Sequence, residues 1–368
     1  MKVIAQTAAL QEALNLTGTV VVSRTPKPVL QCVKLVAADD VLTVLATDLE
    51  AGCRFQISAV QIEQPGEALI PAARLAGIVR ESAGEEALTL ETEKEICHVY
   101  GSGSRFTVYG YDPAEFPAVA EFAEPADFQI RSGIFADMIG KTLFATAKTH
   151  SHYAMAGVLC EAKGKKLSLV ATDGHRLAKT GGQLNATAAN DVAAIVPTKL
   201  MNLIQRVAGD GEDGEIMDIR VQENQIVVRT PRATLVSALV QGNFPPYSNV
   251  IPDSANRKAT LNAGQFEHRI RQAALLTDEQ TRSVKLSFAG SEVVLSARTP
   301  EAGEAEATCP ITLEGDPLDI GFTPAFLIDA LRVIDADEVT FEMNGSDKPA
   351  VLRAGNDFLY VLMPVDLT

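Results

Sequence analysis

The segment Thr172-Asp173-Gly174-His175-Arg176 holds the side chains that are most suggestive of catalysis. Asp and His could serve as an acid–base pair, and Arg could hold an anion. However, the same strand and turn occur earlier in the chain as Ala46-Thr47-Asp48, where no histidine follows. A turn-forming aspartate that accepts hydrogen bonds from its own backbone explains both segments more simply. We therefore expect no catalytic residue here.

Other reactive residues form no recognisable site either. His150 and His152 lie two residues apart, without the acidic or cysteine cluster that would complete a metal site. The segment Gly101-Ser102-Gly103-Ser104 lacks the lysine of a phosphate-binding loop, so it is predicted to be a hairpin turn. No GxSxG, HExxH or cofactor fingerprint occurs. The sequence thus predicts a non-catalytic protein with no cofactor and no metal.

Composition indicates a water-soluble protein of several domains. The 368 residues are 46% hydrophobic and 21% charged, and no apolar run is long enough to cross a membrane. The N-terminal segment is broken by polar residues and predicts an amphipathic helix, not a signal peptide. Five scattered cysteines without a CxxC pair favour a reducing cytoplasm. The net charge of −15 repels nucleic acid on average, so any contact with DNA must be local.

Three landmarks recur in the same order about every 126 residues. A strand leads into a Thr-Asp or Thr-Pro turn at 42–50, 167–175 and 293–301. A strand ends near Pro71, Pro197 and Pro324, each of which is predicted to open a helix. An amphipathic helix is predicted to begin each copy, over 8–16, 134–143 and 266–276. Short alternating segments between them predict strands. The chain is therefore predicted to be α+β, with three repeated domains at 1–124, 125–255 and 256–368.

Several short strings stand in a fixed order and spacing along the chain. They are Thr47-Asp-Leu-Glu50, Glu115-Phe-Pro117, Ala171-Thr-Asp-Gly-His-Arg-Leu-Ala178, Phe244-Pro-Pro-Tyr247 and Tyr360-Val-Leu-Met-Pro-Val365. Together they resemble the β sliding clamps, the β subunits of bacterial DNA polymerase III, over the whole chain. The resemblance implies a non-catalytic processivity factor. In that family two chains of three sliding-clamp domains join head to tail in a ring around duplex DNA, with helices lining the hole and antiparallel sheets outside.

The resemblance also implies a pocket for a short extended peptide with aliphatic and aromatic anchors. The partners would be the DNA polymerase III α subunit, the clamp loader, and other polymerases and repair proteins. Its lining would be Met155, Thr172, Gly174, His175, Arg176, Leu177, Pro245, Asn249, Val250, Pro349, Val361, Leu362, Met363, Pro364 and Val365. An arginine that the family has near the position of Asn249 is absent here, and Asp366 stands where a basic residue can occur. The charge at the rim of the pocket is therefore expected to differ from that of the family. The alternative is that the C-terminal strand simply completes a sheet.

If helices face the DNA, their charge should differ from that of the rest of the chain. The predicted helical windows together hold ten lysines and arginines and five carboxylates, which gives a net charge of +5 in a chain of −15. These windows are 6–18, 71–82, 131–148, 197–208, 261–274 and 324–334. Such a lining suits sequence-independent contact with phosphates. With two loop residues added by resemblance, the predicted DNA-facing residues are Arg24, Arg74, Arg80, Lys141, Lys148, Tyr153, Lys199, Arg206, Arg269 and Arg271. Ordinary solvated helix faces are the alternative.

A subunit interface is implied between the first domain of one chain and the third domain of its partner. It would place Arg105, Phe106 and Val108 against Leu275 and Leu276, with Glu301, Glu304 and Glu306 as charge partners. The alternative is that the apolar members are core residues. A self-associating scaffold that does not encircle DNA is the competing function, and the acidic charge favours it.

Overall fold

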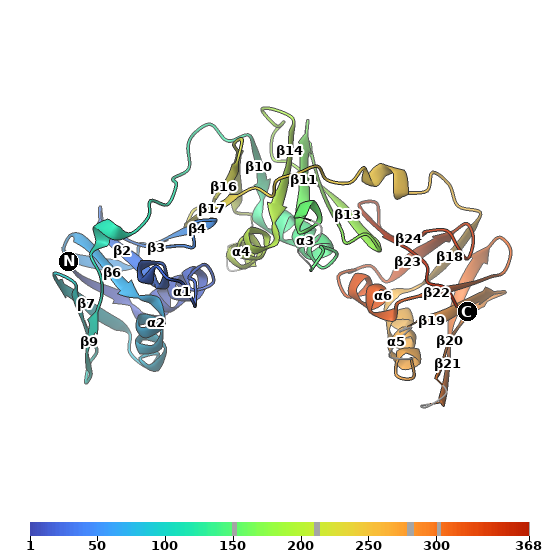
Figure 1. Cartoon of the computed structure of the whole chain (residues 1–368), viewed down its shortest axis with the longest axis horizontal. Coiled ribbons are helices and arrows are strands. Elements are labelled where there is room, and N and C mark those ends of the chain that lie inside the picture. Colours follow the sequence, from blue (N-terminus) through green and yellow to red (C-terminus); the bar gives the residue numbers. More distant parts are fainter. Residues whose placement is uncertain (149–152, 210–213, 278–282, 300–302, 368) are drawn as a thin grey trace. The chain divides into compact units, whose positions relative to one another are not determined.

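The computed structural model describes residues 1–148, 153–209, 214–277, 283–299 and 303–367 (Figure 1). Contacts divide the chain into two compact units. The first comprises Met1–Ala136, Leu184–Val192 and Lys199–Leu239, and the second comprises Asp137–Gln183, Ala193–Thr198 and Val240–Thr368. The middle third of the sequence is therefore shared between the two units, and the predicted division into three domains stays a prediction.

Within these residues the same order of elements occurs three times: strand, helix, four strands, helix, three strands. The first copy, which has one extra strand (β5), contains β1 (Lys2–Gln6), α1 (Thr7–Thr17), β2 (Cys32–Ala38), β3 (Val41–Thr47), β4 (Ala51–Ile57), β5 (Val60–Gln64), β6 (Gly66–Pro71), α2 (Ala72–Glu81), β7 (Ala87–Glu93), β8 (Ile96–Tyr100) and β9 (Arg105–Tyr109). The second contains β10 (Phe128–Arg131), α3 (Ser132–Leu143), β11 (Gly157–Lys163), β12 (Lys166–Thr172), β13 (Arg176–Gln183), β14 (Val192–Pro197), α4 (Thr198–Gly209), β15 (Ile216–Val221), β16 (Gln225–Arg229) and β17 (Ala233–Ala238).

The third copy contains β18 (Arg257–Asn262), α5 (Ala263–Ala274), β19 (Val284–Ala289), β20 (Glu292–Thr299), β21 (Gly303–Glu314), β22 (Leu318–Phe322), α6 (Pro324–Leu331), β23 (Glu338–Met343), β24 (Ala350–Ala354) and β25 (Phe358–Leu362). Short 3-10 helices η1 (Pro28–Gln31), η2 (Pro113–Glu115), η3 (Tyr153–Met155) and η4 (Tyr247–Val250) lie in the connections. None of the described helices is long and apolar enough to cross a membrane.

The local sequence explains most of these elements. Strands such as β19 bury every second residue, as expected when one face of a sheet meets a core. The N-cap of α2 is Pro71, Pro197 directly precedes α4, and Pro324 is the first residue of α6, so proline marks each helix start. The predicted helices are confirmed, but α1, α3 and α5 begin one, two and three residues earlier than predicted, and α5 ends two residues earlier. The prediction that a helix begins each copy is wrong, because a short strand (β1, β10 or β18) precedes the first helix of every copy.

Each unit has its own sheets. The first unit holds a five-stranded sheet of order β5-β1-β7-β8-β9 and an eight-stranded sheet of order β10-β15-β16-β17-β4-β3-β2-β6. The second unit holds one twelve-stranded sheet of order β14-β11-β12-β13-β25-β24-β23-β18-β21-β20-β19-β22. Helices α1 and α2 contact each other in the first unit, as α5 and α6 do in the second. The fold is thus α+β with antiparallel strand pairing, as predicted.

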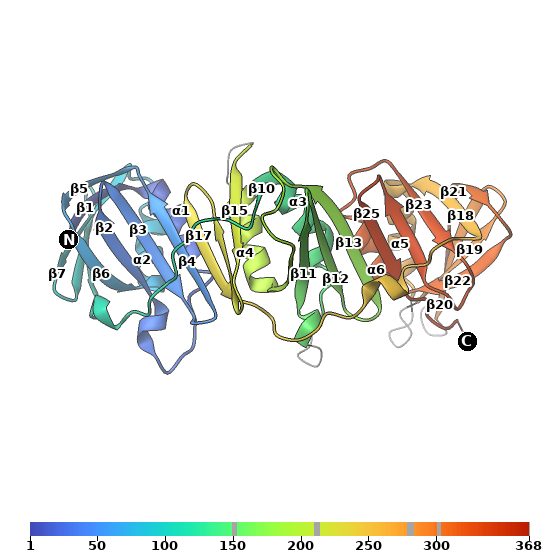
Figure 2. The same ribbon diagram turned by 90° about the horizontal axis from the view of Figure 1, so that it is seen from above.

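Two strand pairs join one copy of the repeat to the next. In the first unit β4 pairs with β17, with Cys53 opposite Leu235. In the second unit β13 pairs with β25, with Ala178 opposite Tyr360, and the two strands run side by side in Figure 2. We call these the first and second junctions. They use the same two strands of the repeat in the same register.

Candidate functional site

The turn between β12 and β13 is held by its own side chains. Thr172 Oγ1 accepts a hydrogen bond from the N–H of Gly174 (3.1 Å) and donates to the carbonyl of Arg176 (2.7 Å). The Asp173 carboxylate accepts from the N–H groups of His175 (3.0 Å) and Arg176 (3.1 Å). Gly174 has φ +91°, a conformation that glycine adopts without strain.

The turn between β3 and β4 is built in the same way. Thr47 Oγ1 accepts from the N–H of Leu49 and donates to the carbonyl of Ala51, and Asp48 accepts from the N–H groups of Glu50 and Ala51. Leu49, at φ +80°, takes the place of Gly174. Asp48 accepts the same backbone hydrogen bonds as Asp173, although no histidine follows it. The interpretation of both aspartates as turn-forming residues is therefore confirmed.

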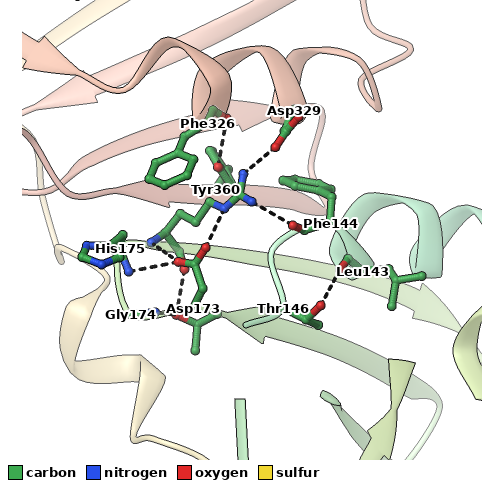
Figure 3. Close-up of polar contacts among 11 residues, drawn as sticks. Leu143, Phe144, Thr146, Asp173, Gly174, His175, Phe326, Asp329 and Tyr360 are labelled. Atoms are coloured by element: carbon green, nitrogen blue, oxygen red, sulfur yellow. Dashed lines mark hydrogen bonds and ion pairs between the residues drawn. The ribbon is translucent and has the colours of Figure 1, made fainter. Parts of the chain in front are cut away.

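Arg176 ties this turn to distant parts of the second unit. Figure 3 shows the residues that it joins, with Asp173 in the turn and Phe144 and Asp329 outside it. Its side chain is only 4% exposed, and it donates to Asp173 (2.9 Å), to Asp329 of α6 (2.8 Å) and to the carbonyl of Phe144 (2.9 Å). The guanidinium also lies 4.3 Å from the ring centre of Phe326. A buried charge needs such partners, since an unpaired one would be strongly destabilising.

The surroundings keep Arg176 charged. Burial by itself would lower the pKa of the guanidinium, but Tyr360, Asp329 and Asp173 outweigh that effect and raise it. For the Tyr360 hydroxyl, burial has the opposite effect and raises the pKa. This hydroxyl donates to the carbonyl of Phe326 (2.9 Å). Arg176 was predicted to orient a bound peptide. Its three guanidinium nitrogens donate to the turn, to α6 and to the Phe144 carbonyl, so Arg176 has a structural role. Its role in orienting a peptide stays a prediction.

A cavity of about 380 Å³ opens beside this turn in the second unit. Its lining consists of Met155, Thr172, Gly174, His175, Arg176, Leu177, Pro245, Pro246, Tyr247, Asn249, Val250, Val361 and Met363. Leu177 and Val361 belong to the hydrophobic core beneath it, so the floor is apolar and closely packed. At the rim Met363 and Val250 are 41% and 44% exposed, and His175 and Asn249 are exposed as well. The structure brings eleven of the fifteen predicted pocket residues together here.

Two residues of the lining, Pro246 and Tyr247, were not predicted. Tyr247 donates to Glu161 (2.7 Å), and Lys179 Nζ lies 5.1 Å from the centre of its ring. Burial and the bond to Glu161 raise the pKa of Tyr247 to about 12, so the hydroxyl stays a donor at neutral pH. The Phe-Pro-Pro-Tyr string that carries both residues was visible in the sequence. Only the fold shows that they reach the cavity.

Four predicted residues, Pro349, Leu362, Pro364 and Val365, do not line the cavity. Leu362 is fully buried in β25, whose neighbours β13 and β24 cover both of its edges. Alternation along the strand turns it away from Val361, which does line the cavity. Val365 instead donates to the carbonyl of Gly321 (2.9 Å) beside β22. The alternative that the C-terminal strand completes a sheet therefore holds for Leu362.

The predicted DNA-facing residues divide into two groups. Arg24, Arg74, Lys148 and Arg206 are exposed. The others are engaged locally: Arg80 with Glu81, Lys141 with Asp137, Lys199 with Asp48, Arg269 with Gln272 and Arg271 with Glu267. An ion pair with a carboxylate lowers the net attraction of a cation for phosphate.

Lys199 is expected to contribute to the stability of the fold through its ion pair with Asp48. Burial would raise the pKa of Asp48, but hydrogen bonds from Lys199 and from the backbone outweigh it and lower the pKa. A carboxyl with a depressed folded-state pKa stabilises the fold above its unfolded-state value, and that stability is lost as the pH falls. We expect Lys199→Met to cost below about 1 kcal/mol at pH 7 and still less below pH 4. Urea titrations of both proteins at each pH measure this, and a cost that grows with acidity would contradict it.

The predicted interface residues lie on two segments. Arg105, Phe106 and Val108 are on β9, where Val108 is buried and Phe106 is partly exposed. Leu275, 80% exposed, is the C-cap of α5, and Leu276 follows it. Glu304 and Glu306 are exposed on β21, where Glu304 pairs with Arg298 (3.0 Å). Leu275 is therefore a surface residue, whereas Val108 packs inside its own unit.

Some predicted residues cannot be placed. His150, His152 and Glu301 lie outside the described residues, and so does the side chain of Tyr153. Among the residues that are described, no group of three or more His, Cys, Asp or Glu side chains is arranged to hold a metal ion. The five cysteines are buried as free thiols, and burial raises the pKa of Cys32 to about 11 and of Cys53 to about 12.

Three family models match consecutive segments of the chain. They describe the N-terminal (residues 1–120), central (129–246) and C-terminal (248–366) domains of the DNA polymerase III beta subunit. Among curated proteins, the beta sliding clamp of Pseudomonas aeruginosa is 30% identical over 364 residues, with 98% of this chain and 99% of that one covered. The beta sliding clamp of Bacillus subtilis is 28% identical over 378 residues, with 99% of each covered.

Solved structures give the same result. The crystal structure of the DNA polymerase sliding clamp from Bacillus subtilis matches with a TM-score of 0.94 at 26% identity, covering all of both chains. The sliding clamp (DNA polymerase III subunit beta) from Pseudomonas aeruginosa, bound to griselimycin, matches with a TM-score of 0.93 at 30% identity, also over all of both chains.

Proposed function

This chain belongs to the DNA polymerase III beta subunit family, the beta sliding clamps, and we propose that two copies close head to tail into a ring that encircles duplex DNA. The ring acts in the cytoplasm without catalysing a reaction. It holds the polymerase III α subunit, the clamp loader and other polymerases and repair proteins on DNA through a peptide groove.

The strand pairing within the chain supports closure by a second copy. At each internal junction the last strand of one copy, β17 or β25, pairs with β4 or β13 of the copy before it. The corresponding last strand of the first copy, β9, lies at a sheet edge. The counterpart of β4 and β13 in the third copy is β21. Its residues 303–310 pair with β20 on one side, and the described strands leave the other side unpaired. One chain therefore carries both halves of a further junction, which suits a head-to-tail contact.

The repeat also predicts the register of that contact. Followed through the strand registers of each copy, Phe106 corresponds to Leu235 and Tyr360. Ala305 likewise corresponds to Cys53 and Ala178, because these residues pair with the equivalent alanines Ala297, Ala46 and Ala171. Phe106 of one chain should thus lie opposite Ala305 of the other. One residue along, the same antiparallel register brings Arg105 opposite Glu306. An apolar centre beside a charge pair suits a stable and specific interface.

The cavity of the second unit supports the peptide groove. Preformed apolar walls reward the burial of leucine and phenylalanine anchors, whereas exposed backbone and polar groups orient the peptide. Leu177 and Val361 supply the floor, and His175 stands exposed at the rim. Met155 and Met363 line the same cavity, and flexible thioether side chains let one site adapt to several partners.

DNA topology tests the ring directly. The chain is loaded by its clamp loader onto nicked circular DNA and filtered at moderate salt, and the DNA is then cut once. We expect the chain to stay on the circle and to be lost on cutting, since a ring slides off a free end. Equal retention on circular and linear DNA would instead favour a scaffold that does not encircle DNA.

Met363→Asp should abolish binding of partner peptides while leaving the ring on DNA. The side chain is 41% exposed, so the charge does not disturb the core, but it would face the apolar anchor of a bound peptide. We expect affinity for a labelled hexapeptide ending in Leu-Phe to fall at least thirtyfold, equivalent to about 2 kcal/mol. Fluorescence anisotropy measures this. Ile216→Asp makes the same change at another exposed apolar residue, 42% exposed and outside the cavity lining, and should bind normally.

A further inference from the structure

The first junction repeats the elements that surround the cavity at the second junction. From the strand registers, Gly52 and Val236 correspond to Leu177 and Val361. The connecting segments both begin with Phe-Pro, at Phe116 and Phe244. Counting onward, Val119 corresponds to Tyr247 and Phe122 corresponds to Val250. Three of these pairs lie in corresponding hydrophobic clusters: Val236 and Val361, Phe116 and Phe244, and Val119 and Tyr247.

At the first junction the chain itself fills the space above the floor. A Cβ atom added to Gly52 would lie 2.8 Å from Val119 Cγ1 and 2.9 Å from Val236 Cγ1. Val119 is therefore seated directly on bare backbone, where the second junction has the side chain of Leu177. It is 7% exposed. At the second junction Tyr247 is held aside by Glu161 and Lys179, and the cavity remains open.

Two arginines hold this segment down. Arg229 lies 4.3 Å from the ring centre of Phe122, and it is itself bound to Asp218 (2.9 Å) and to Glu124. Arg54 donates to the carbonyl of Val119 (3.4 Å) and pairs with Glu121 (2.7 Å). Phe122 packs against the same hydrophobic cluster. Its counterpart Val250 is 44% exposed instead and lines the open cavity.

We propose that the first junction is a second, closed copy of the partner groove, in which Val119–Phe122 of the same chain occupies the place of the peptide. The proposal rests on the partner groove of the second junction. Removing the two apolar side chains opens a site for the same class of extended peptide with aliphatic and aromatic anchors. The built-in segment thus restricts each chain to one partner.

Calorimetric stoichiometry tests this on the intact dimer, with a hexapeptide ending in Leu-Phe as the probe. We expect one peptide per chain for the wild type and two for Val119→Ala/Phe122→Ala. Met363→Asp removes binding at the second junction. A chain with this change alone should therefore bind no peptide, and a chain that also carries Val119→Ala and Phe122→Ala should bind one. Ala118→Ser/Ala123→Ser alters exposed residues of the same segment and should leave one peptide per chain.

The outcomes separate the two proposals. A double variant that is folded, as judged by a single cooperative unfolding transition and an unchanged dimer mass, yet still binds one peptide would overturn the closed groove alone. A wild type that binds none would overturn the partner groove, and the closed groove with it. If the double variant does not fold, Arg229→Gln removes the contact above Phe122 together with the ion pairs to Asp218 and Glu124, and it leaves Val119 and Phe122 in place. A second, weaker peptide would support the proposal in that variant, and its absence up to millimolar peptide would overturn it.

Discussion

Phe106→Asp is expected to convert the dimer into folded monomers. The counterparts of Phe106 at the two internal junctions, Leu235 and Tyr360, are fully buried by the strand that pairs beside them. Phe106 is only partly exposed on an edge strand, so its own fold tolerates a polar residue there. In the closed interface the carboxylate would be buried opposite Ala305 without a partner. That costs several kcal/mol, or more than a hundredfold in the dimer dissociation constant.

Light scattering across a dilution series measures the dissociation constant. Ile216→Asp is the matched control, because it places the same charge on an exposed apolar residue of β15, away from β9. An unchanged melting temperature of the monomer would show that the fold survives. A Phe106→Asp chain that remains dimeric at nanomolar concentration would contradict the predicted junction.

The register itself is open to a charge-swap test. Arg105→Glu should weaken the dimer because it would face Glu306 of the partner copy, and adding Glu306→Arg should restore most of the affinity. Adding Glu304→Arg in place of Glu306→Arg should restore less, since Glu304 already pairs with Arg298 and lies two residues away on β21. Equal rescue by both would indicate a different register.

Arg176→Met is expected to destabilise the second unit by about 3–5 kcal/mol, the usual cost of removing one partner from a buried ion pair. The substitution keeps an apolar stem beside Phe326 but leaves Asp329 and the carbonyl of Phe144 without their donor. The turn that shapes the cavity would also lose its anchor. Peptide binding should therefore weaken together with stability, because the turn shapes the cavity.

Arg353→Met provides the matched control in the same unit. Its guanidinium pairs with Glu342 (2.8 Å), but the side chain is 38% exposed, so water replaces the lost partner and the cost should stay below about 1 kcal/mol. Urea unfolding followed by fluorescence from a dye attached within the second unit measures both. Removing the stranded carboxylate with Asp329→Ala in the Arg176→Met background should recover part of the loss. Similar losses for the two arginine variants would contradict a buried, structural Arg176.

Much of the local structure follows from local sequence. Proline at a fixed place in each copy predicted where three helices begin, and alternation predicted that short strands lie between the helices. The Thr-Asp turns were predictable because a short side chain satisfies its own backbone wherever it occurs. The family resemblance supplied the pocket residues, of which eleven line one cavity.

Burial and strand neighbours, by contrast, depend on contacts far apart along the chain. Arg176 and Arg353 are both arginines in strands, and the sequence around them does not distinguish a buried side chain from an exposed one. Only Arg176 contacts α6 and the end of α3 and is buried. Lys199 looks like a phosphate contact until the fold places it against Asp48. The repeat places Val119 and Tyr247 at the same position, but side-chain volume beside Gly52 or Leu177 decides which junction is filled. Local propensity sets the order of elements and their turns, because those depend on neighbouring residues. Whether a side chain is paired, buried or left at an open groove is decided only when distant strands come together.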